Sequence, residues 1–201
     1  MKSKSIIGLQ VLCTLLLAMT AVSCDKDSQE TEVPPVTMEY FSLNDKEIKA
    51  NAPGFSIDVN HDGRKDLAFT TQLVGDPLFQ VDKLQFLVST NIQVNLPVNS
   101  SEEIPIMSKG ASIMLENFNG YEWFELSSIL LVQKVLSNTA PPVWEGPWRN
   151  AAHKYLPYQV LVNGKRFNGW VELTVDITGQ RIILHKAAVS TIPDKIIKAG
   201  E

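Results

Sequence analysis

A run of nine residues, 58–66, combines residue types and spacing that could bind a hard metal ion. It reads DVNHDGRKD, with oxygen-bearing side chains at its first, third, fifth and ninth positions and glycine at its sixth. Calcium takes about six to eight oxygen ligands, and alternate positions on a tight loop can aim oxygens at one centre. We therefore predict a calcium site whose ligands are Asp58, Asn60, Asp62, Asp66 and the backbone carbonyl of Arg64.

The run differs from an EF-hand loop, which needs a glutamate at its twelfth position. That position is Phe69 here, within residues typical of a strand. Residues 57–69 resemble instead the calcium loops of integrin-alpha-type (FG-GAP) repeats, which follow D-x-[DN]-x-D-G-x-x-D. The resemblance implies a strand-loop-strand calcium site. The alternative is an Asx-rich hairpin loop without metal, because Asp and Asn side chains also stabilise turns.

The N-terminus predicts where the protein is held. Two lysines precede an apolar run, which ends in Ala-Val-Ser-Cys at residues 21–24. This pattern is typical of a secretory signal, and the tetrapeptide resembles the lipobox of bacterial lipoproteins. The resemblance implies cleavage after the signal peptide 1–23 and acylation of Cys24, which would anchor the chain in a membrane. The alternatives are an uncleaved transmembrane helix and an ordinary secretory signal.

Residues 24–37 form a predicted tether, because they are polar, acidic and end near two prolines. An acidic run directly after the cysteine looks like the export signal of surface lipoproteins in glycan-scavenging Gram-negative bacteria. It implies a lipid anchor in the outer membrane and exposure at the cell surface. In enteric bacteria, Asp25 at this place is associated instead with retention in the inner membrane, and that alternative stays open.

Composition limits the remaining chain to one ordinary domain, residues 38–201, which is long enough to bury its own core. Loss of residues 1–23 removes two lysines and no acid, so the formal charge falls from −4 to −6. An acidic chain without basic clusters argues against nucleic-acid binding. The only cysteines are Cys13 and Cys24, so we expect no disulfide in the domain.

The domain itself shows the pattern of an all-β protein. Val171, Leu173 and Val175 alternate with polar residues, as in a half-buried strand. Asn163-Gly164 is the favoured two-residue hairpin turn. Many short strands without an internal repeat predict an antiparallel β-sandwich or barrel. We predict strands at 39–43, 55–59, 67–73, 84–90, 92–96, 121–126, 129–136, 158–162, 165–176 and 181–190, with a helix as the alternative for 129–136.

A weaker resemblance covers the whole domain. Some lipoproteins of uncertain function pair one such calcium loop with a C-terminal hairpin that contains Gly-Trp. Residues 163–191, with Gly169-Trp170, match that hairpin. The resemblance implies a β-sandwich and leaves the function open.

Aromatic residues crowd the segment 144–158. Exposed aromatics stack on sugar rings or peptides and can form a binding platform. The alternative is that they lie in the core, since large aromatics are mostly buried. The candidates for this ligand platform are Trp144, Trp148, Tyr155 and Tyr158.

No catalytic pattern stands out. Glycosidases use a pair of carboxylates, but the spacing of Glu122, Glu125, Glu145 and Glu172 singles out no pair. His153 and His185 are single histidines without ligand spacing, so we do not expect zinc. We predict a non-enzymatic binding or envelope-interaction module whose partner is a glycan or an envelope protein. A glycan-active hydrolase and a purely structural envelope component are the alternatives.

Overall fold

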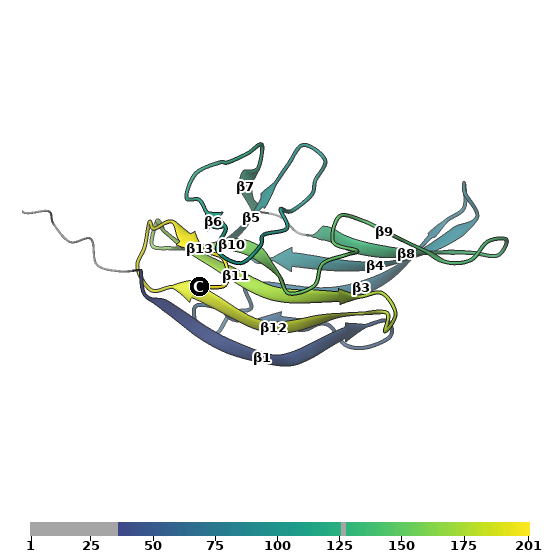
Figure 1. Ribbon diagram of the computed structural model, residues 1–201, viewed down its shortest axis with the longest axis horizontal. Helices are drawn as coiled ribbons and strands as arrows, with labels where there is room; N and C mark the ends of the chain where they lie inside the picture. The colour runs from purple at the N-terminus through teal and green to yellow at the C-terminus, as the bar shows by residue number, and fades with distance from the viewer. Residues whose placement is uncertain (1–35, 126–127) are drawn as a thin grey trace, which may run out of the picture. The chain divides into compact units, whose positions relative to one another are not determined.

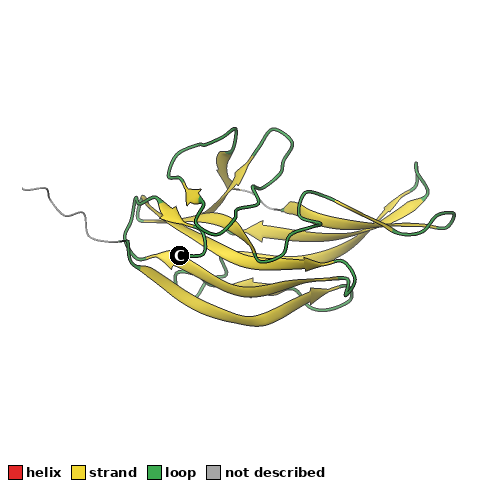
Figure 2. Ribbon diagram, viewed as in Figure 1, coloured by secondary structure: helices red, strands yellow, loops and turns green. Residues whose placement is uncertain are grey.

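The computed structural model describes residues 36–125 and 128–201, and within these ranges every regular element is a strand. Figure 2 shows strands joined by loops. The fold is an antiparallel β-sandwich, so the predicted all-β class is confirmed. Cys24 and most of the predicted tether lie outside the described residues. Within the described part of the chain, no helix has the length and apolarity to cross a membrane.

Two large sheets form the sandwich (Figure 1). The five-stranded sheet has the order β2 (Phe55–Ile57), β3 (Leu67–Asp76), β4 (Val81–Thr90), β8 (Ile129–Ser137), β9 (Val143–Glu145). The six-stranded sheet has the order β1 (Met38–Lys49), β12 (Arg181–Ser190), β11 (Lys165–Asp176), β10 (Lys154–Val162), β5 (Val94–Val98), β7 (Glu122–Glu125). A third, two-stranded sheet pairs β13 (Ile197–Lys198) with β6 (Ser112–Ile113).

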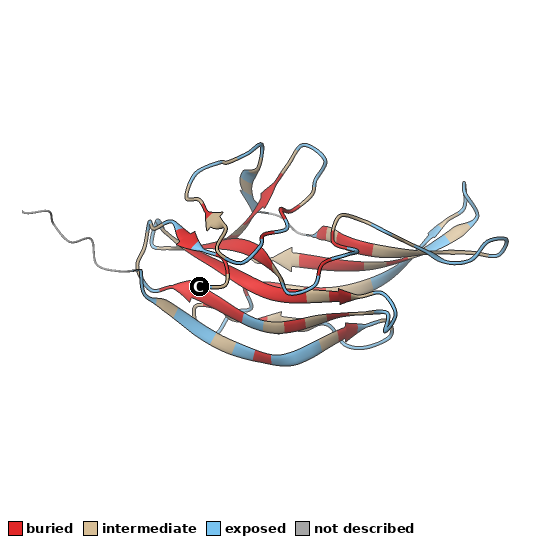
Figure 3. Cartoon of the chain, in the orientation of Figure 1, coloured by how far each residue is buried: buried red, intermediate tan, exposed pale blue. Residues whose placement is uncertain are grey.

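The main core lies where apolar positions of both large sheets meet. Val171, Leu173 and Val175 of β11 are buried there, as their alternation predicts. Phe69 and Phe86 contribute from the five-stranded sheet and are fully buried. Figure 3 shows burial along most of β10, β11 and β12, whereas the edge strand β1 is largely exposed or half-buried. Apolar burial of this kind is the main favourable term in folding.

A second, smaller core covers part of the other face of the six-stranded sheet. Tyr155, Trp170 and Ala188 from β10, β11 and β12 pack with Ile113 and Ile197 of the two-stranded sheet. Residues on both faces of β10 and β11 are therefore buried. This explains why β10 is apolar at most positions, apart from Lys154 and the buried Gln159, and does not alternate.

Local signals predicted several elements well. Asn163 and Gly164 have φ values of 51° and 74° and join β10 to β11, as the type I′ hairpin turn requires. Residues 129–137 form β8, paired with β4 and β9, so the helical alternative is wrong. The predicted strand at 92–96 lies at Val94–Val98, and β10 begins four residues before its predicted start, at Lys154.

Candidate functional site

Loop 58–66 joins β2 to β3 and is closed by the pair Ile57 and Leu67. The Asp66 backbone N–H donates to the Ile57 carbonyl at 2.8 Å. The side chain of Asp66 lies inside the loop, because its Oδ2 accepts the Val59 N–H at 2.8 Å and the residue is only 2% exposed. The loop thus wraps around a buried carboxylate.

The other predicted ligands orient the turn through their side chains. Asp58 Oδ2 accepts the Gly63 N–H at 3.0 Å, and Asn60 Oδ1 accepts the Asp62 N–H at 3.0 Å. Asp62 Oδ1 accepts the Arg64 N–H at 2.8 Å. Gly63 has a φ of 85°, a conformation that glycine adopts without strain. These contacts account for the spacing of the Asp and Asn residues in the loop, because each side chain accepts a backbone N–H of an Asx-rich turn.

One oxygen in this loop has no protein partner among the described residues. Asp58 Oδ1 is buried and accepts no hydrogen bond, although buried polar atoms are nearly always satisfied by a protein group, water or an ion. Burial raises the pKa of Asp66, and the nearby Asp62 and Asp58 carboxylates raise it further. A cation would offset both the desolvation and the repulsion.

The donor set suits calcium more than zinc. No three His, Cys, Asp or Glu side chains within the described ranges are grouped so that they could hold a metal ion. A site in loop 58–66 therefore needs the Asn60 amide and the Arg64 carbonyl as well as carboxylates. Amide and carbonyl oxygens are ordinary calcium ligands, so the residues present fit calcium, and the loop without metal remains the alternative.

His61 connects this loop to β1. Its side chain is 60% exposed, and its Nε2 lies 3.3 Å from Glu39 Oε1. Its ring also meets the Phe41 ring edge-on, at 5.9 Å between centroids. The loop at the end of one sheet is thereby attached to the edge strand of the other.

The aromatic segment does not form the predicted ligand platform. Trp148 and Tyr158 are fully buried and Tyr155 is 5% exposed. Trp144 is half-buried and packs on Phe86, 5.8 Å between ring centroids. The reason is non-local: the backbone N–H of Trp148 donates to the Leu131 carbonyl at 3.2 Å, and this bond holds the segment against the core. The alternative placement in the core is the one observed.

The four candidate acids are separated on three strands. Glu145 lies on β9, where it accepts the Gln133 amide at 3.2 Å. Glu172 on β11 is buried, and its carboxylate contacts His153 Nδ1 at 2.7 Å and Lys186 Nζ at 3.4 Å. Glu122 and Glu125 both lie on β7, three residues apart. The structure therefore does not bring the four together into one carboxylate site.

Sequence reasoning missed a cluster of two histidines, His153 directly before β10 and His185 on β12. The rings of His153 and His185 stack at 4.4 Å between centroids. His185 Nδ1 lies 2.6 Å from Asp45 Oδ1, and its Nε2 lies 2.9 Å from Thr174 Oγ1. The register of β1 against β12 shifts between Ser42 and Lys46, beside Asp45. Only strand pairing could reveal this cluster, because its members lie far apart in the sequence.

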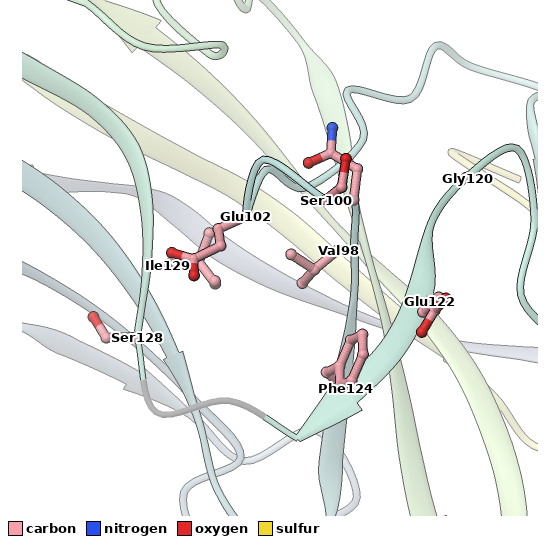
Figure 4. A pocket seen from close by; sticks show the side chains of 9 residues that line it. Val98, Ser100, Glu102, Gly120, Glu122, Phe124, Ser128 and Ile129 are labelled. Carbon is pink, nitrogen blue, oxygen red and sulfur yellow. The ribbon is translucent and has the colours of Figure 1, made fainter.

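Sequence reasoning also missed an open cavity of about 570 Å³, named here the β7 cavity. It lies where β5 and β7 meet the start of β8 (Figure 4). Glu122 and Phe124 point from the same face of β7, and Val98 of β5 pairs with Glu122. The lining residues are Val98, Asn99, Ser100, Glu102, Gly120, Glu122, Phe124, Ser128 and Ile129.

No protein-family model, curated protein or solved structure matches this chain.

Proposed function

We propose that the protein is a lipid-anchored module of the bacterial envelope that binds a ligand without converting it. Cys24 would carry the lipid, residues 25–37 would form the tether, and the β7 cavity would hold the ligand. The lipobox and signal pattern of the N-terminus support the anchor. The observation that carries the binding role is the cavity, whose size falls within the range of about 300–1,000 Å³ usual for ligand sites.

The composition of the cavity supports binding. Val98, Ile129 and the half-exposed ring of Phe124 give it an apolar floor. Two carboxylates and two serine hydroxyls give it a few polar groups. Ligand sites commonly combine an apolar surface with a small number of such groups.

The hydrolase alternative rests on Glu102 and Glu122, which line the same cavity. In Figure 4 the two carboxyl groups lie on opposite sides of Val98 and are not directed at one another. A glycosidase needs both groups to flank one scissile bond. The arrangement therefore favours binding over hydrolysis. Release of reducing sugar that disappears in Glu122→Gln would reverse this preference.

Calcium would have a structural role at a separate place. Loop 58–66 would hold it through Asp58, Asn60, Asp62, Asp66 and the carbonyl of Arg64. The buried Asp58 Oδ1, for which residues 36–125 and 128–201 supply no hydrogen-bond partner, supports this assignment. Bound calcium would neutralise the carboxylates of the loop and would hold the loop fixed between β2 and β3.

A screen of immobilised glycans and envelope-protein peptides against the purified chain, with calcium present, tests the proposed binding role. Wild type should retain at least one ligand that Phe124→Ala loses. Phe124 is 46% exposed, so its truncation should leave the fold intact, which circular dichroism would verify. Val143→Ala is the matched control, because Val143 is an exposed residue of another edge strand. Equal binding by wild type and Phe124→Ala would reject the cavity as the site.

A further inference from the structure

We propose that the β7 cavity accepts a lysine or arginine side chain from an extended peptide segment. This inference rests on the proposed ligand-binding role of the cavity and names the chemical class of its ligand. It is carried by the charge, the shape and the free groups of the lining residues.

The cavity carries two negative charges and no positive one. Glu102 and Glu122 line it, and no lysine, arginine or histidine does. Neither carboxylate forms an ion pair or a side-chain hydrogen bond with a described residue. Elsewhere on the same domain, exposed acids such as Glu116 and Asp194 do find a cation, here Arg166. The two carboxylates of the cavity therefore remain available to a cation from outside.

Loop 99–103 holds one of these carboxylates in position. Asn99 Oδ1 accepts the N–H groups of Ser101 and Glu103, both at 2.9 Å. The Glu102 N–H donates to the Asn99 carbonyl at 3.0 Å, and Glu102 has a φ of 60°. A non-glycine residue in this left-handed region is uncommon and is sustained here by the surrounding contacts. Glu102 is thus presented by a folded turn.

The same turn engages one of the two N–H donors of the Asn99 amide. Asn99 Nδ2 donates to Glu103 Oε2 at 3.2 Å. Among the described lining residues, the side-chain donors that remain free are the second Nδ2 N–H of Asn99 and the hydroxyls of Ser100 and Ser128. An anionic ligand would therefore meet two carboxylates and only a few neutral donors. A cationic ligand would meet acceptors, as charge complementarity between partners requires.

The exposed ring of Phe124 favours a cation with a long apolar stem. This ring is 46% exposed on β7, where Phe124 pairs with Leu96 of β5 and lines the same cavity as Val98. A lysine or arginine has a long apolar stem that packs along such a surface while its charged end reaches polar groups. Arginine also stacks on aromatic faces. The cavity volume of about 570 Å³ exceeds one side chain, so flanking residues of an extended peptide fit too.

End-blocked tri-arginine, titrated calorimetrically into the purified full chain, is the direct test. End-blocked tri-citrulline is the matched probe, since it keeps the shape and loses the charge. Tri-arginine should bind, and tri-citrulline should bind at least tenfold more weakly. Binding should weaken as salt rises from about 20 to 300 mM, because exposed charges are screened over about 8 Å at physiological ionic strength.

Variants separate this inference from the broader binding role. Glu102→Gln combined with Glu122→Gln should weaken tri-arginine binding at least tenfold. Glu125→Gln should not, because Glu125 lies on the same strand but outside the cavity lining. Equal affinity for tri-arginine and tri-citrulline, no binding of tri-arginine, or an unchanged double variant would overturn the cationic ligand. A further outcome is a neutral ligand, such as an oligosaccharide, whose binding is lost in Phe124→Ala and kept in the double Gln variant. That outcome would overturn the cationic ligand and would still support the cavity as a binding site.

Discussion

The carboxylate of Asp66 accepts a 2.8 Å hydrogen bond from the backbone N–H of Val59, across the loop that both residues help to close. This contact places a buried carboxylate at the centre of loop 58–66. Asp58 Oδ1, also buried, has no hydrogen-bond partner within the described part of the chain. A folded loop of this kind offers acceptors to a cation that the unfolded chain would not hold in place.

Calcium should therefore stabilise the folded protein. A ligand that binds only the folded state at a hundredfold excess over its Kd adds about 2.7 kcal/mol to the free energy of unfolding. Chelation should lower the Tm of wild type, and Asp62→Ala should melt lower and lose most of its response to calcium. Differential scanning calorimetry with and without chelator measures both effects.

His61→Ala is the control for that experiment. Its ring contacts Phe41 and Glu39 but belongs to no predicted ligand, so any fall in Tm should be small and the response to calcium should persist. If wild type melts identically in calcium and in chelator, and native mass spectrometry detects no metal, loop 58–66 is an Asx-rich turn.

Gly169→Ala should destabilise the domain. A Cβ at Gly169 would overlap the Tyr158 ring, and Tyr158 cannot move away because it is fully buried and donates to the Ala188 carbonyl at 3.0 Å. Overpacking of this kind costs about 1–3 kcal/mol of unfolding free energy. Denaturant unfolding gives the value.

Gly75→Ala is the matched strand glycine. The nearest heavy atom to its added Cβ would be Asp82 Oδ1, at 3.5 Å, so stability should be unchanged or slightly increased. Equal stability of Gly169→Ala and wild type would show that the close approach of β10 and β11 at this point is not required.

The β3–β4 hairpin should gain stability from Asp76 above its pKa. The Lys83 ammonium donates to Asp76 Oδ2 at 2.8 Å and, with the Phe79 N–H, lowers the pKa of Asp76 below 3.8. A carboxyl whose pKa is lower in the folded state than in the unfolded state stabilises the folded state at pH values above its unfolded-state pKa. This stabilisation is lost as the pH falls through the pKa that the carboxyl has in the folded protein.

The pH dependence of Tm in variants measures this contribution. Asp76→Asn and Lys83→Met should each lower Tm slightly at neutral pH, and their difference from wild type should vanish in acid. The effect should be small and salt-sensitive, because both side chains are partly exposed. A difference that persists unchanged in acid would mean that the pair contributes through packing and not through charge.

Cys24→Ser should abolish lipidation and release the protein into the soluble envelope fraction, since the lipid is the proposed anchor. Acyl labelling and fractionation of cells measure this. Cys13→Ser is the matched control, because Cys13 lies within the predicted signal peptide and should leave acylation intact. Persistence of the Cys24→Ser protein as an integral membrane protein would contradict the lipobox.

Local patterns along the chain determined the class of the fold and several of its parts. Alternation in β11 and the Asn163-Gly164 turn act between neighbours in sequence, so each could be recognised from a few residues. The same holds for loop 58–66, whose ligand candidates and turn glycine lie within nine residues. Strand β9, by contrast, spans Val143–Glu145 only and is defined by pairing with β8.

Tertiary structure decided which side chains face solvent and which meet. Trp148 and Tyr158 are buried because distant strands pack against them, which composition alone cannot reveal. Glu102 and Glu122 line one cavity because β5 pairs with β7. His153, directly before β10, stacks on His185 of β12 because β11 pairs with both β10 and β12. Such meetings depend on the register between strands, where a shift of one residue turns every side chain to the opposite face of the sheet.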